Sequence, residues 1–144
     1  MLQLDDLNDI IPDELLHRAM TALGSLADKA KDFAKKIPEA LLPLFENMTT
    51  ALKKAIKFNT FGLEVDELTM EQFVEFIKNH IVKGCNQSVA IKCVEEDGIF
   101  IYVTFAHDRE LLPEDKNKTL IIKAKTLASE VSELFGENEL IILN

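Results

Sequence analysis

The sequence is poor in the side chains that most often build metal sites and redox centres. Its 144 residues contain no tryptophan, one tyrosine, two cysteines and three histidines. Cys85 and Cys93 have neither the spacing of a zinc site nor the number needed for a disulfide framework, and the histidines are scattered. We therefore expect two free thiols in a reducing compartment, no metal and no cofactor, and we assign the protein to the cytoplasm.

Long hydrophobic runs, glycine and proline are also scarce. No run of about 18 apolar residues occurs, so a membrane-spanning helix is not expected. The first eleven residues, MLQLDDLNDII, carry acidic side chains where a signal peptide carries basic ones, so export by that route is not expected. With five glycines, four prolines and 47% hydrophobic residues, the chain is expected to fold around a core rather than stay disordered.

Basic residues are outnumbered, and the imbalance is concentrated in one part of the chain. The net charge is −9; residues 1–58 hold eight Lys/Arg and nine Asp/Glu, whereas residues 59–144 hold eight and sixteen. Binding to a phosphate backbone depends on lysine and arginine side chains that displace counterions. The acidic C-terminal part therefore argues against a nucleic-acid partner.

Residues 1–58 are predicted to form an α-helical hairpin. Pro12 followed by two acids is typical of a helix start, and Pro38 and Pro43 predict a break before a second helix. Apolar residues step by three and four along both helices: Leu15, Ala19, Ala22, Leu26, Ala30, Phe33 and Ile37, then Leu41, Phe45, Met48, Leu52 and Ile56.

The same segment carries a lysine-rich face, formed by Lys29, Lys31, Lys35, Lys36, Lys53, Lys54 and Lys57. One interpretation is an interfacial helix pair on anionic lipid. The other is the solvated face of a hairpin that covers the rest of the protein or a second copy. Acidic residues between the lysines favour the second interpretation, so a membrane partner is not expected.

Residues 59–144 are predicted to form a ferredoxin-like domain. We expect a strand over residues 61–65, a helix that begins at a capping box of Thr69 and Gln72, strands over 89–94 and 99–105, a helix over 119–135 and a strand over 139–143. This βαββαβ order predicts an α+β fold with a four-stranded antiparallel sheet and both helices on one face. Residues 120–123 form an apolar run that fits a strand as well as a helix.

Residues 88–105 are the clearest strand pair, and two loops can join its strands. A two-residue Asp97-Gly98 turn places Ile91 and Cys93 on the face of Phe100 and Tyr102. A three-residue loop with a G1 bulge, Glu96-Asp97-Gly98, moves the pairing by one residue. We prefer the bulged loop because it gives one wholly apolar face for the helices, made of Val89, Ile91, Cys93, Ile99, Ile101, Val103 and Phe105.

The opposite face of this hairpin is the first candidate for a partner-binding surface. It would hold Phe100 and Tyr102, with Lys92 and Val94 beside them. An apolar face of this kind needs a cover. We expect the cover to be the helical hairpin, a protein partner or a second copy of the chain.

Residues 98–105, GIFIYVTF, resemble the third-strand signature of RNA-recognition motif domains at three aromatic positions, Phe100, Tyr102 and Phe105. In that family the first two stack on bases and the third lies in the core. The sequence departs from the signature elsewhere: Gly98 and Ile99 replace its basic residue and glycine, and Ile101 replaces its small residue. The resemblance covers eight residues, and RNA binding is not expected.

Few residues are placed for catalysis. His107, Asp108 and Arg109 form a polar cluster after the second hairpin strand and are a candidate acid–base site. Cys85 near His80 could supply a nucleophile and a base, but His80 lies on the apolar stripe of its helix, which favours a core histidine. No phosphate-binding glycine loop and no Ser-His-Asp motif occur.

These patterns favour a small, acidic, non-catalytic protein-binding module of regulatory, adaptor or inhibitor type, with a homodimer as one arrangement. Two alternatives stay open. One is a small-ligand binder or minor enzyme with a pocket between the helices and the sheet. The other is a nucleic-acid or membrane-surface binder that uses the lysines of residues 29–57.

Overall fold

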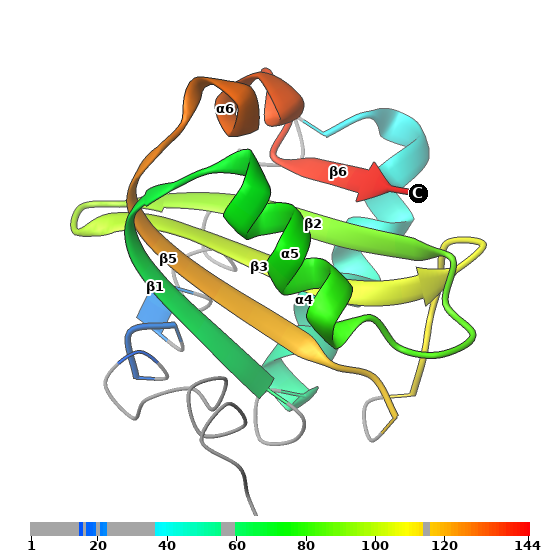
Figure 1. The fold of residues 1–144 in the computed structure, drawn as a ribbon. Coiled ribbons are helices and arrows are strands. Elements are labelled where there is room, and N and C mark those ends of the chain that lie inside the picture. The colour runs from blue at the N-terminus through cyan, green and yellow to red at the C-terminus, as the bar shows by residue number, and fades with distance from the viewer. Residues whose placement is uncertain (1–14, 16, 20, 23–36, 56–59, 114–115) are drawn as a thin grey trace, which may run out of the picture.

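The protein has an α+β fold built on one mixed sheet with helices on both faces (Figure 1). The computed structural model describes residues 15, 17–19, 21–22, 37–55, 60–113 and 116–144, and of residues 49–55 it describes the backbone alone. The α+β class predicted from the sequence is confirmed. No helix in these ranges is long and apolar enough to cross a membrane.

In chain order the elements are the 3₁₀ helix η1 (Glu39–Leu41), α4 (Leu42–Ala55), β1 (Thr60–Leu68), α5 (Met70–His80), β2 (Gln87–Glu95), β3 (Gly98–His107), β4 (Glu110–Leu111), β5 (Thr119–Leu127), α6 (Ser129–Phe135) and β6 (Leu140–Leu143). Residues 15, 17–19 and 21–22 are helical. The rest of the predicted first helix lies outside the described residues. The second predicted helix corresponds to α4.

The sheet has the strand order β1-β5-β3-β2-β6, and the short β4 pairs with β3. β1 and β5 are parallel, whereas the other neighbouring pairs are antiparallel. A ferredoxin-like sheet would be antiparallel throughout and four-stranded, so this predicted topology is not confirmed.

The predicted helix over residues 119–135 was wrong in its first half, which forms β5. The side chains from Thr119 to Ala124 are all buried. A central strand that is covered on both faces has a continuous apolar run instead of an alternating pattern, and such a run does not distinguish strand from helix. The remaining half forms α6, which is much shorter than the predicted helix.

The preferred register of the β2–β3 hairpin was also wrong. Glu95 pairs with Gly98, so the loop consists of Glu96 and Asp97 and contains no bulged glycine. The pairs Ile91–Tyr102 and Cys93–Phe100 place these four side chains on one face. The loop that we rejected gave this same division of the faces, although it named different turn residues.

The predicted register was wrong because Gly98 was assigned to the turn, whereas it belongs to strand β3. It lies within β3 at φ 155°, and a Cβ atom there would stand 3.0 Å from the carbonyl oxygen of Ala124 in β5. The close approach of the neighbouring strand and the positive φ angle therefore both favour glycine at this position. A sequence pattern alone does not separate this role from that of a turn glycine.

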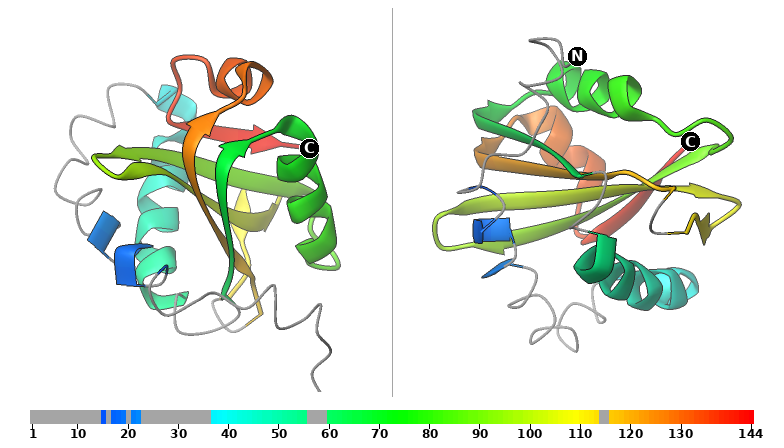
Figure 2. Two further views of the ribbon diagram at one scale, coloured as in Figure 1. Left: turned by 60° about the vertical axis from the view of Figure 1, so that its left-hand side comes forward. Right: turned by 90° about the horizontal axis from the view of Figure 1, so that it is seen from below.

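Helices cover both faces of the sheet, as the view along the sheet in Figure 2 shows. One face packs against α4 and the described helical residues 15, 17–19 and 21–22 in a cluster that includes Leu15, Ala19, Met48, Phe100 and Tyr102. The other face packs against α5 and α6 in a cluster that includes Phe73, Ile101, Phe105 and Phe135. The division into residues 1–58 and 59–144 stays a prediction, and described residues of both parts share the first cluster.

Helix α5 begins and packs as the sequence predicts. The Thr69 hydroxyl accepts a hydrogen bond from the Gln72 amide at 3.2 Å, and the Gln72 side chain accepts one from the Thr69 amide at 3.2 Å. Phe73, Phe76, Ile77 and His80 form its buried face. The capping box and these four buried positions are therefore confirmed, because both depend on residues within one turn of each other. Ile81, which the same spacing predicts for the buried face, lies beyond the end of α5 and is 51% exposed.

Candidate functional site

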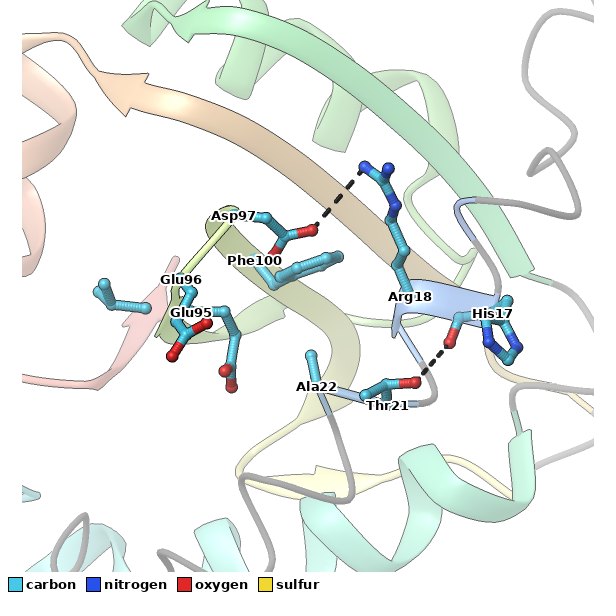
Figure 3. Close-up of a pocket in the computed structure, with 9 residues that line it drawn as sticks. His17, Arg18, Thr21, Ala22, Glu95, Glu96, Asp97 and Phe100 are labelled. Atoms are coloured by element: carbon cyan, nitrogen blue, oxygen red, sulfur yellow. Dashed lines mark hydrogen bonds and ion pairs between the residues drawn. The ribbon is translucent and has the colours of Figure 1, made fainter.

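An open groove of about 520 Å³ lies beside the tip of the β2–β3 hairpin (Figure 3). Two separate parts of the chain form it: the helical residues 17–18 and 21–22, and residues 94–100 of the hairpin. Its lining residues are His17, Arg18, Thr21, Ala22, Val94, Glu95, Glu96, Asp97 and Phe100. Acidic side chains predominate over basic ones in this lining.

Asp97 joins the two parts of the groove. Its Oδ2 atom lies 3.8 Å from Nη1 of Arg18 and 3.5 Å from Nζ of Lys123 (Figure 3 shows the Arg18 contact). The Lys123 side chain is only 7% exposed, whereas that of Asp97 is 55% exposed. An ammonium group that is removed from water needs an anion nearby, so Asp97 stabilises a buried cation of the central strand β5.

Tyr102 connects the sheet to Ala19 in the N-terminal helical part of the chain. Its hydroxyl donates a hydrogen bond to the Ala19 carbonyl oxygen at 3.2 Å, and its ring stacks with that of Phe100 at a centroid distance of 6.2 Å. Burial raises the pKa of Tyr102 well above its ordinary value, and the negative charges that Cys93 and Glu95 can carry raise it further.

The outer lip of the groove combines an apolar and an acidic surface. Val94 is 58% exposed, the highest value among the large hydrophobic side chains that the structure describes as exposed. Glu95 and Glu96 follow it, and Oε1 of Glu95 accepts a hydrogen bond from the Cys93 thiol at 3.2 Å. The hairpin tip thus carries one exposed apolar side chain and two carboxylates, but Val94 borders the groove from the face of β2 opposite Phe100.

The structure separates the residues of the predicted partner-binding face. Phe100 and Tyr102 are buried in a cluster with Leu15, Ala19 and Met48, so their cover is within the same chain. Lys92 and Val94 belong to the opposite face of β2, where Nζ of Lys92 lies 5.3 Å from the centroid of the Phe135 ring. Partner binding by Phe100 and Tyr102 stays a prediction, and it would require residues 15–22 to move away.

The candidate acid–base cluster forms a tight turn between β3 and β4. Nε2 of His107 lies 3.3 Å from Oδ2 of Asp108, and both side chains are exposed. Asp108 and Arg109 have φ angles of 49° and 68°, and their amides donate to the side chains of Asn86 and Gln87. Two successive positive φ angles are typical of a type I′ turn, so these polar residues already have a structural role.

The two cysteines and His80 have the positions expected of core residues. Cys93 is buried and Cys85 is partly buried; both are free thiols. Burial raises the pKa of Cys85, which lowers its thiolate fraction at neutral pH and makes it a poor nucleophile. Nδ1 of His80 lies 2.9 Å from the Phe76 carbonyl oxygen, and its ring packs against Phe61 and Phe76.

Sequence reasoning missed Arg18, Asp97 and Lys123 as a group. A lysine inside the apolar run 120–124 was a usable signal, because a lysine in a buried strand predicts a carboxylate partner. No group of three His, Cys, Asp or Glu side chains within the described residues is arranged to hold a metal ion. Comparisons with protein-family models, curated proteins and solved structures find no match.

Tyr102 is the only tyrosine and the chain has no tryptophan, so it gives a specific probe of the contact with residues 15–22. We expect the native protein to show no tyrosinate absorbance near pH 10, where an exposed tyrosine is half ionised, and to develop it in urea. Because the unfolded state loses this proton first, stability should be unaffected below pH ~10 and should decline above it. A native absorbance titration with an ordinary midpoint would contradict the buried position.

Proposed function

We propose that the protein is a non-catalytic protein-binding module and that the groove at the tip of the β2–β3 hairpin receives part of its partner. The single observation that supports this most is the exposure of Val94, which borders the groove at the hairpin tip and is followed in the chain by Glu95 and Glu96. Interfaces commonly surround an apolar contact with a polar rim. A partner segment with an apolar side chain and nearby basic side chains matches this lip.

The arrangement of charges in the groove supports a basic partner. Asp97 is already engaged by Arg18 and Lys123, so the carboxylates of Glu95 and Glu96 dominate the potential at the lip. Complementary charges accelerate association and exclude partners of like charge. The excess of acidic residues in the chain acts in the same direction at longer range.

Photocrosslinking in the native cell tests this proposal. A benzoylphenylalanine at position 94 is expected to capture a discrete protein, whereas the same residue at position 74 is not. Val74 is a matched control because it is an exposed valine, 38% accessible, on helix α5. Capture of the same proteins at both positions, or of none at position 94, would contradict a partner at the groove.

A small ligand is the second candidate, and the groove volume favours it. About 520 Å³ lies within the range of known small-molecule sites, roughly 300–1,000 Å³. Native mass spectrometry of the protein isolated from its own cells distinguishes the two. A bound small molecule that is lost when His17, Thr21 and Glu95 are replaced with alanine would favour this candidate.

The nucleic-acid and membrane alternative depends on the lysine side chains of residues 29–57. These side chains lie outside the described part of the structure. That alternative stays a prediction. Vesicle flotation and a salt-dependent RNA shift test it directly.

A further inference from the structure

Strand β1 forms one edge of the sheet. In the part of the chain that the structure describes, it pairs with β5 alone. It spans nine residues, Thr60–Leu68, and all but Asp66 have a paired residue in β5. An edge strand presents a row of backbone N–H and C=O groups that can pair with another strand (β1 lies at one side of the sheet in Figure 1, and β6 at the other).

Two hydrogen bonds show which residues direct these groups outward. The Leu68 carbonyl oxygen accepts from the Ala128 amide at 3.0 Å, and the Asp66 carbonyl oxygen accepts from Oγ1 of Thr126 at 3.4 Å. Even-numbered residues of β1 therefore direct their backbone groups towards β5. Because successive residues of a strand alternate, the groups of Phe61, Leu63, Val65 and Glu67 point away from β5.

The side chains along this edge are strongly acidic at its C-terminal half. Glu64, Asp66 and Glu67 are exposed. Within the described residues, Asp66 forms an ion pair with Lys125 at 3.5 Å, and it is weak because both side chains are more than 75% exposed. A depression of about 500 Å³ along β1 and β5 leaves room for further side chains; these three carboxylates line it together with Lys123 and Lys125.

The acidic side chains of β1 determine which kind of strand can pair with this edge. If β1 paired antiparallel with β1 of a second copy, Glu64 would face Glu64, or Asp66, according to the register. Like charges directly opposite each other destabilise a strand pair, so self-association at this edge is disfavoured. Lysine or arginine in the added strand would instead form favourable cross-strand pairs.

We propose that β1 is a docking edge for an extended segment of a partner protein with basic residues at alternate positions. Basic side chains would lie next to Glu64 and Asp66, on one face of the extended sheet. The intervening side chains would lie next to Leu63 and Val65, which pack partly against the α5 and α6 cluster, so they would be apolar. This inference goes beyond the hairpin groove and does not depend on it.

The test uses a designed peptide, TKVKVKVT, with the full-length protein. We expect it to bind, and we expect binding to weaken as salt is added. A peptide of the same composition with grouped lysines, TKKKVVVT, is expected to bind about tenfold more weakly, because its charges do not alternate with the strand. Equal binding of the two peptides would show that binding depends only on general charge attraction, and it would overturn the proposal.

Charge-reversal variants locate the site. The double variant Glu64→Lys with Asp66→Lys is expected to weaken binding of TKVKVKVT about tenfold or more. Glu75→Lys with Glu133→Lys changes the net charge equally at exposed positions on α5 and α6, and should have less than a twofold effect. An equal loss in both variants would place the peptide elsewhere.

Amide hydrogen exchange gives a readout that charge attraction would not change. In the free protein the amides of Gly62 and Glu64 should be protected by β5, and those of Leu63, Val65 and Glu67 should exchange quickly. Peptide binding should protect the second set. Protection of that set in the free protein, or no gain on binding, overturns the proposal; neither result affects the crosslinking test at Val94.

Discussion

Replacing Gly98 with alanine is expected to destabilise the protein by about 3 kcal/mol, from a backbone conformation open mainly to glycine and from steric overlap with β5. The added Cβ would stand 3.0 Å from the carbonyl oxygen of Ala124 and 3.2 Å from Cε of Lys123. The lysine side chain can shift, but the carbonyl belongs to a central strand held by both neighbours. The cost should therefore appear as lost stability rather than as a local adjustment.

Gly84→Ala is the matched control for this prediction. Gly84 also has a positive φ, 93°, but a Cβ there would meet no atom within 4 Å. Its replacement should cost only the conformational penalty, about 1–2 kcal/mol. Urea unfolding followed by Tyr102 fluorescence measures both variants. Equal losses would mean that the approach of β5 does not constrain Gly98.

Replacing Asp97 with asparagine is expected to lower the free energy of unfolding by about 2 kcal/mol, because the buried ammonium of Lys123 would lose the carboxylate with which it forms an ion pair. The half-exposed position of Asp97 keeps this value below the range for fully buried pairs, since water can approach the group that remains. Lys123→Met removes the cation and keeps much of the side-chain volume. It should change stability by less than about 1 kcal/mol.

A double-mutant cycle separates the ion pair from its neighbours. If Asp97 mainly compensates Lys123, then Asp97→Asn in the Lys123→Met background should cost at least about 1 kcal/mol less than in the native background. Arg18 is the remaining partner of Asp97 in that background. Additive losses would show that the two residues act independently, and Asp97 would then serve mainly to hold Arg18 and residues 15–22.

Only part of the candidate sites could be predicted from the sequence, because some of their features depend on neighbouring residues and others on contacts between distant segments. The hairpin and its exposed Val94 could be named from the sequence, because alternating β-branched residues around a turn are a local signal. The face of the sheet on which each residue lies could not be predicted from the sequence. That depends on a loop one residue shorter than the preferred one, and a shift of one residue exchanges the two faces.

The sequence by itself determined the α+β class, the capping box and buried face of α5, the core position of His80 and the existence of the hairpin. Each of these depends on residues a few positions apart. Only the tertiary structure decided that residues 119–127 form a central strand parallel to β1, that Gly98 is needed by Ala124, and that Arg18, Asp97 and Lys123 meet. These contacts join distant segments, and their energy comes from burial on both faces of one sheet, which no local pattern encodes.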